Sequence, residues 1–102
     1  MEAVLAGRLR FQLNDQEWTL DAISEGDDSL FVAFKDRSSG KSTYGPGRFL
    51  TLASPVEGRV TIDFNKAYNP PCAFSPHTLC PLPPRQNHLD FEINAGERMD
   101  SK

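Results

Sequence analysis

The chain has 102 residues, a formal net charge of −3 and 38% hydrophobic residues, which is typical of one small globular domain, residues 1–102. The negative net charge argues against a general nucleic-acid-binding protein, because the phosphate backbone attracts basic surfaces. No apolar run is long enough to span a membrane, and the N-terminus lacks the regions of a signal peptide. We therefore expect a cytoplasmic domain that binds neither nucleic acid nor membrane.

Apolar and polar residues alternate with a period of two along much of the chain, which is typical of antiparallel strands with one buried face. In chain order this pattern predicts strands over residues 5–13, 18–22, 30–34, 48–52, 58–65 and 89–93. The third of these strands is apolar on both faces, so we expect it to be central. Beyond a single turn at residues 66–68, no segment predicts a helix. The fold class is therefore all-β, a small antiparallel barrel or two-layer sandwich of about six strands.

A proline-rich loop, residues 70–84, follows the fifth expected strand. It holds six of the eight prolines of the chain and both cysteines. Each proline fixes φ and removes a backbone donor, so the segment is stiff. Phe74, Leu79 and Leu82 give it apolar side chains to bury. We expect an ordered loop that covers the sheet and packs on it through these three residues.

Polar residues at the end of the fifth expected strand form a candidate site beneath this loop. If the apolar residues of the strand face the core, Asp63 and Asn65 lie on its opposite face. We expect Asp63 to be ionised and paired with Arg48 or with N–H groups of the loop, because a guanidinium and a carboxylate form paired hydrogen bonds. These polar side chains either anchor the loop or line a pocket that Tyr68 covers.

Cys72 and Cys80 are separated by seven residues. In a cytoplasmic protein a stable disulfide is rare, so we expect two reduced thiols that pack under the loop. His77 and His88 would complete a set of four potential zinc ligands, but the spacing is not one that zinc sites use. The sequence thus indicates no metal and no cofactor, while a catalytic Cys–His pair stays open.

The chain resembles the uncharacterised prokaryotic family known as domain of unknown function sixteen-eighty-four. The resemblance covers essentially the whole chain and is densest from Thr43 to Glu97. It is carried by four runs, Thr43–Leu50, Asp63–Phe74, Cys80–Pro84 and Ala95–Glu97, together with Asn87. The family pattern includes both cysteines, and its relatives often carry an additional N-terminal segment. The resemblance implies no known activity.

Three classes of function are compatible with these residues. We favour a domain that binds a small molecule, such as an anionic ligand, in a polar cleft under the proline-rich loop. The alternatives are a structural or protein-interaction domain, and a hydrolase-like enzyme that uses Asp63 or Cys72. The sequence does not define the oligomeric state. The predicted ligand-binding residues are Tyr44, Arg48, Asp63, Asn65, Tyr68, Asn69, Cys72 and Cys80.

Overall fold

A computed structural model describes residues 1–5, 8–24, 28–74 and 80–99. These residues form seven antiparallel strands and three short 3₁₀ helices, with no α-helix in the described ranges. The strands are β1 (Glu2–Leu5), β2 (Leu9–Leu13), β3 (Gln16–Leu20), β4 (Ile23–Ser24), β5 (Leu30–Phe34), β6 (Arg48–Leu52) and β7 (Arg59–Thr61). The 3₁₀ helices are η1 (Phe64–Lys66), η2 (Pro71–Ala73) and η3 (Arg85–Asn87). The all-β prediction is confirmed.

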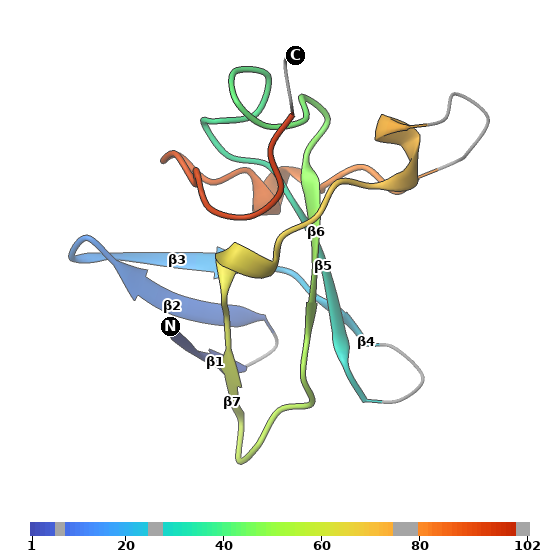
Figure 1. Ribbon diagram of the computed structural model, residues 1–102. Helices are drawn as coiled ribbons and strands as arrows, with labels where there is room; N and C mark the ends of the chain where they lie inside the picture. Colours follow the sequence, from blue (N-terminus) through green and yellow to red (C-terminus); the bar gives the residue numbers. More distant parts are fainter. Residues whose placement is uncertain (6–7, 25–27, 75–79, 100–102) are drawn as a thin grey trace.

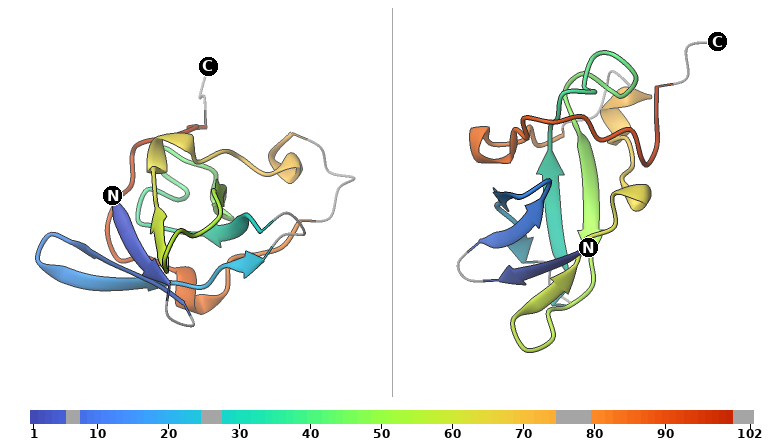
Figure 2. Two further views of the ribbon diagram at one scale, coloured as in Figure 1. Left: turned by 90° about the horizontal axis from the view of Figure 1, so that it is seen from below. Right: turned by 90° about the vertical axis from the view of Figure 1, so that its left-hand side faces the viewer.

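The strands form two separate sheets, one ordered β3-β2-β1-β7 and the other β4-β5-β6. Figures 1 and 2 show that the sheets lie on two sides of a shared interior and do not close on each other. This arrangement favours the sandwich over the barrel. Strand β5 lies between β4 and β6, so the prediction of a central third strand is confirmed. No helix in the described ranges is long and apolar enough to cross a membrane.

The hairpin of β2 and β3 follows directly from the sequence. Asn14 and Asp15 form its two-residue turn with φ values of 55° and 62°, and these residue types tolerate the left-handed conformation that such turns require. The strands pair in register from Leu9 with Leu20 to Leu13 with Gln16. Consequently, alternate residues of β2 enter the core.

Side chains from both sheets and from the segment after η3 fill the core. Phe64 contacts both Phe11 and Phe34 edge to face, with ring centroids 6.3 Å and 5.5 Å apart. Val60 and Ile62 are buried with Phe64, as the alternation of the fifth expected strand predicts. The core is therefore shared between the two sheets, and the polar loops lie at its ends.

Three expected elements differ from the structure. The segment 5–13 contains the end of β1 and all of β2, two antiparallel strands in which Leu5 pairs with Leu9. The segment 58–65 is a strand only over β7, which ends at Thr61, because the chain then turns into η1 from Phe64. Residues 89–93 form no strand, although Leu89 and Ile93 are buried. Two isolated backbone–backbone hydrogen bonds join this segment to the chain after β5, from Leu89 N to Lys35 O (2.7 Å) and from Arg37 N to Phe91 O (3.0 Å).

Candidate functional site

Arg48, the first residue of β6, anchors the C-terminal segment to the core. Its guanidinium donates to three backbone carbonyls of that segment, those of Ala95 (2.6 Å), Ile93 (2.8 Å) and Glu97 (3.0 Å). The side chain is fully buried and lies over the Phe34 ring, 5.3 Å from its centroid. Arg48 thus fixes the course of the residues that follow Ile93.

The carboxylate that accompanies Arg48 belongs to Asp36. Asp36 Oδ1 lies 3.6 Å from Arg48 Nη2, and Asp36 Oδ2 accepts from Ile93 N (2.6 Å) and from Ser38 N and Oγ (3.0 and 2.6 Å). Burial lowers the pKa of the Arg48 guanidinium, and the Asp36 carboxylate opposes that effect. The expected pairing of Arg48 with Asp63 is therefore wrong, because the partner comes from the loop after β5.

Asp63 instead caps η1. Its Oδ1 accepts a hydrogen bond from Asn65 N at 3.0 Å, and Asn65 is exposed. Asp63 forms no hydrogen bond with the described residues of the loop that begins at Pro70, so that expectation is likewise wrong for them, and the partner of Oδ1 lies two residues away in sequence. Asp63 and Asn65 thus contribute to a local turn, an arrangement that short acidic side chains adopt readily.

Replacing Asp63 with Ala should lower the free energy of unfolding by about 1 kcal/mol, the usual contribution of a capping side chain. Asp63→Asn should be nearly neutral, because asparagine also accepts from the second following N–H. Urea denaturation of both variants measures the difference. A loss of several kcal/mol in Asp63→Asn would contradict the capping role and restore that of a buried ion pair.

The described residues of the proline-rich loop, 70–74 and 80–84, pack against the chain before β6. Between them lies a small apolar cavity of about 110 Å³, lined by residues that include Tyr44, Phe49, Cys72, Cys80 and Pro83. Gly47, with φ of 118°, permits this approach, because a Cβ there would lie 2.7 Å from Pro83 Cγ and 2.5 Å from the Phe34 carbonyl oxygen. The space beneath the loop is therefore narrow and apolar, and the polar cleft lies elsewhere.

Two of the three side chains expected to bury this loop do not do so. Phe74 is 70% and Leu82 74% exposed, since prolines and the cysteine pair make the contacts instead. Leu79 lies outside the described residues, as does His77.

Cys72 and Cys80 are joined in a disulfide, so the prediction of two reduced thiols is wrong. Their Cα atoms are 6.3 Å apart, a separation that a disulfide spans. The backbone N–H of Cys72 also donates to Cys80 Sγ at 3.3 Å. The bond therefore closes the loop at its base and fixes η2, of which Cys72 is the middle residue.

Tyr68 supports the outer side of β6. Its backbone exchanges hydrogen bonds with Phe49 at 2.9 and 3.0 Å, and its ring packs edge to face on the Phe49 ring at 5.8 Å. The phenol oxygen lies 3.3 Å from Thr51 Oγ1. Tyr68 thus extends the sheet edge, and the next residue, Asn69, turns toward the C-terminal segment.

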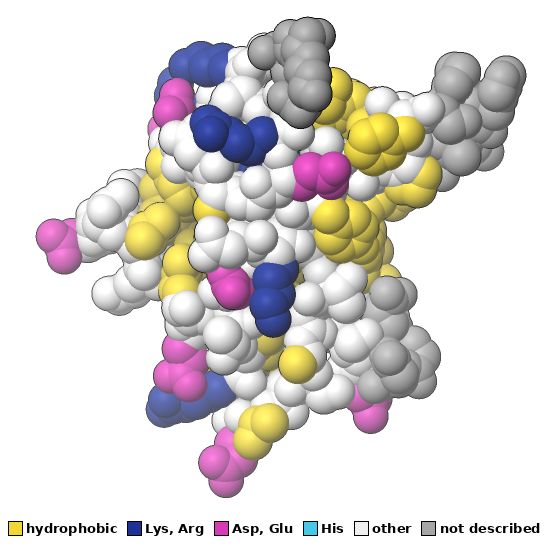
Figure 3. Space-filling model, viewed as in Figure 1, with side chains coloured by type: hydrophobic (Ala, Val, Ile, Leu, Met, Phe, Trp, Pro, Cys, Tyr) yellow, Lys and Arg dark blue, Asp and Glu magenta, His cyan; other side chains and the backbone are white. Residues whose placement is uncertain are grey.

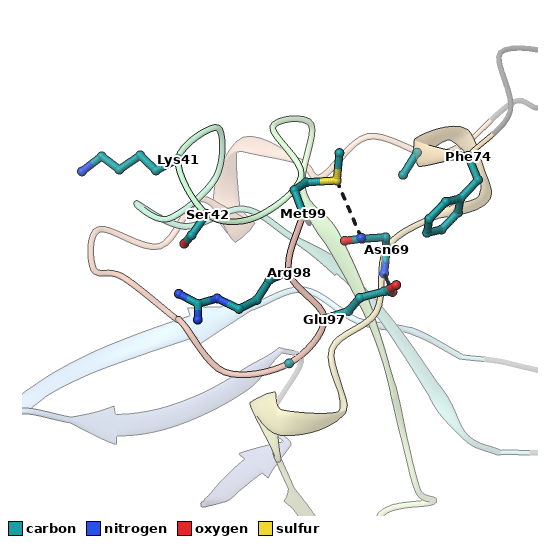
Figure 4. Close-up of a pocket in the computed structure, with 9 residues that line it drawn as sticks. Lys41, Ser42, Asn69, Phe74, Glu97, Arg98 and Met99 are labelled. Carbon is teal, nitrogen blue, oxygen red and sulfur yellow. Dashed lines mark hydrogen bonds between the residues drawn. The ribbon is translucent and has the colours of Figure 1, made fainter. Parts of the chain in front are cut away.

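The larger polar cleft lies where that segment meets the start of the proline-rich loop. Its volume is about 870 Å³, and Figure 4 shows the arrangement of its side chains. The lining residues are Lys41, Ser42, Asn69, Ala73, Phe74, Gly96, Glu97, Arg98 and Met99. Gly96, with φ of 84°, lets the segment lie against η1, because a Cβ there would be 2.6 Å from the Phe64 carbonyl oxygen.

Asn69 is the buried polar residue of this cleft. Only 6% of it is exposed, and its Oδ1 has no hydrogen-bond partner among the described residues. Its Nδ2 makes one weak contact, 3.9 Å to Met99 Sδ, while its backbone N–H donates to Glu97 Oε1 at 2.7 Å. The backbone of Asn69 is therefore fixed by Glu97, while its buried carboxamide keeps an unused acceptor.

The two cationic side chains of the cleft differ in their surroundings. Lys41 Nζ lies 3.2 Å from Glu92 Oε2, and this hydrogen bond lowers the pKa of the Glu92 carboxyl. Arg98 is exposed and forms no ion pair with any described residue. Arg98 is thus the cation of the cleft whose hydrogen-bonding capacity is unused.

The structure divides the predicted site residues among separate places. Tyr44, Cys72 and Cys80 share the small apolar cavity, while Asn69 alone lines the polar cleft. Arg48 lines neither of them, and it donates to the backbone carbonyls of the C-terminal segment. Sequence reasoning missed the other cleft residues. The Gly96-Glu97 pair was an available signal, because it belongs to the run Ala95–Glu97 that carries the family resemblance.

Together, the fold and the cleft define a small two-sheet β domain with an open polar cleft at one end of its core. The chain belongs to the family described as Protein of unknown function (DUF1684), whose family model matches residues 1–98. It is similar to the solution NMR structure of an uncharacterized protein of Haloarcula marismortui, with 32% sequence identity and a TM-score of 0.79. That similarity covers 100% of this chain but 65% of the other, so the chain spans about two thirds of that relative's length. No curated protein matches.

Proposed function

We propose that the domain binds a small molecule in the polar cleft beside the proline-rich loop. The observation that carries this proposal is the buried carboxamide of Asn69, whose Oδ1 is unpaired in the described structure. A buried acceptor without a donor costs about 1–3 kcal/mol, and a ligand N–H or O–H would offset that cost. Met99 lies over the carboxamide but is 42% exposed, so a ligand would displace its thioether.

The other residues of the cleft support this proposal. The volume of about 870 Å³ falls within the range of small-molecule sites, which combine apolar walls with a few polar groups. Phe74, Ala73 and Met99 supply apolar surface, and Arg98 supplies a cation for an anionic group of the ligand. The cleft thus replaces the space beneath the loop as the proposed location.

A thermal-shift screen of metabolite-like compounds tests the proposal, because a ligand that binds only the native state raises its stability. At a concentration about a hundred times its Kd, a hit should stabilise the wild type by about 2.7 kcal/mol. Asn69→Ala should lose most of that stabilisation, whereas Asn65→Ala, which removes an exposed carboxamide outside the cleft, should retain it. Equal stabilisation of the Asn69→Ala variant would place the site elsewhere.

A second candidate function is protein interaction. Phe74 and Leu82 are largely exposed, and Met99 and Tyr68 are partly exposed. Figure 3 shows hydrophobic side chains gathered on the side where η2 lies. Exposed apolar surface of this kind is common at interaction sites. This function is favoured if no small molecule stabilises the protein.

The enzymatic alternative has less support. Asp63 caps a turn, and Cys72 cannot act as a nucleophile while it is part of the disulfide. The cytoplasmic location stays a prediction. The disulfide opposes it, because the cytosol of most organisms keeps thiols reduced.

A further inference from the structure

The cleft has two sides of opposite charge. Glu97 and Arg98 are consecutive residues, and Figure 4 shows their side chains pointing to opposite sides of the C-terminal segment. The Glu97 side chain points toward Asn69, whereas that of Arg98 points to the side of Lys41 and Ser42. A ligand that fills the whole cleft therefore contacts a carboxylate at one end and a guanidinium at the other.

The Glu97 side of the cleft is rich in hydrogen-bond acceptors. One Glu97 carboxylate oxygen accepts from Asn69 N, the second has no hydrogen-bond partner among the described residues, and Asn69 Oδ1 is unpaired. The exposed ring of Phe74 lies on the same side. An ammonium group has three donors and no acceptor, and it is attracted both by a carboxylate and by an aromatic face. This side therefore suits a primary ammonium group better than an anion.

On the Arg98 side of the cleft, Arg98 is the one donor group without a partner among the described residues. Lys41 Nζ forms an ion pair with Glu92 Oε2 at 3.2 Å, and the Ser42 hydroxyl donates to Asn94 Oδ1 at 3.2 Å. Arg98 remains, and a guanidinium binds carboxylates through paired hydrogen bonds. The negative end of a ligand is therefore expected on this side.

We propose, on the basis of the function proposed above, that the ligand is a short peptide with both ends free. Its ammonium group binds Glu97 and Asn69 Oδ1, its first side chain packs on Phe74 and Met99, and its carboxylate binds Arg98. A single amino acid is too short for both ends, because its charges are adjacent whereas Glu97 and Arg98 project to opposite sides. The binding step is reversible and non-covalent.

Isothermal titration calorimetry with the tripeptide Leu-Gly-Gly tests this inference. Its N-acetylated form, its C-terminal amide and free leucine serve as probes that lack one feature each. Each should bind the wild type at least about tenfold more weakly than the tripeptide, because each loses a charge-assisted hydrogen bond. In Glu97→Gln the penalty for N-acetylation should disappear, and in Arg98→Gln the penalty for C-terminal amidation should disappear. Glu17→Gln and Arg85→Gln, which lie outside the cleft, should bind the tripeptide and the three probes as the wild type does.

Four outcomes overturn the inference. Equal affinity for the tripeptide and its capped forms would show that its charges are not recognised. Penalties that persist unchanged in Glu97→Gln and Arg98→Gln would place the charged contacts elsewhere. If no peptide binds while the thermal-shift screen yields another ligand sensitive to Asn69→Ala, the peptide inference fails and the proposed function stands. If no peptide binds and the screen also yields no ligand, both the peptide inference and the proposed function fail.

Discussion

Replacing Arg48 with Met should lower the free energy of unfolding by about 3–5 kcal/mol, the usual loss when one partner of a buried ion pair is removed. Methionine retains much of the apolar stem but leaves the Asp36 carboxylate buried without its cation. It also removes the donors to the carbonyls of Ile93, Ala95 and Glu97. Urea denaturation monitored by Trp18 fluorescence measures the change.

Two further variants show whether the loss arises from this network. Arg48→Lys keeps the charge but lacks the planar guanidinium that donates to several carbonyls at once. Its loss of unfolding free energy should therefore be intermediate. Combining Arg48→Met with Asp36→Asn should cost less than the sum of the single changes, because residues in one network are coupled. Additive losses, or a loss below about 1 kcal/mol in Arg48→Met, would contradict the anchoring role of Arg48.

Replacing both Cys72 and Cys80 with Ser should lower the free energy of unfolding by about 2–3 kcal/mol. The disulfide closes a short loop, with a sequence separation of 8, and the entropy that such a closure removes from the unfolded chain has roughly this magnitude. Denaturation of the wild type with and without a dithiol reductant gives the matched comparison. The reductant should destabilise the wild type by a similar amount and leave the double variant unchanged.

The same experiment tests whether the disulfide shapes the cleft. Cys72 immediately precedes Ala73 and Phe74, both of which line the cleft. Reduction should therefore shift the amide resonances of Phe74 and Asn69 as well as those of the cysteines. Equal stability of the oxidised and reduced wild type would show that the loop is held by its prolines alone.

The sequence predicted the sheets well because burial on one face imposes a period of two on the residues of each strand. The same signal failed at residues 89–93, where Leu89 and Ile93 are buried but the backbone lacks a regular ladder. Alternation reports which side chains are buried, whereas a strand also requires continuous backbone pairing. The break between β1 and β2 was missed because Leu5 and Leu9 fit one alternating run.

The site was less predictable, because it depends on contacts between distant residues. The sequence identified Arg48 as a paired cation, but its partner Asp36 comes from a different loop and carries no distinguishing pattern. By contrast, the local role of Asp63 could have been predicted instead of an ion pair, since an aspartate accepts readily from the N–H two residues later. Asn69 was included in the predicted site, while the side chains opposite it lie near the C-terminus and have no periodic signal.

The central claim is that the domain binds its ligand in the cleft around Asn69. The most direct measurement is a titration of ¹⁵N-labelled protein with the strongest hit of the screen, followed by amide chemical shifts. The largest shifts are predicted at Ser42, Asn69, Phe74 and the segment 96–99, with little change in β1 and β2. Saturable shifts confined to Tyr44, Phe49 and Leu82, which line the small apolar cavity, with none at Asn69 or Glu97, would contradict the claim.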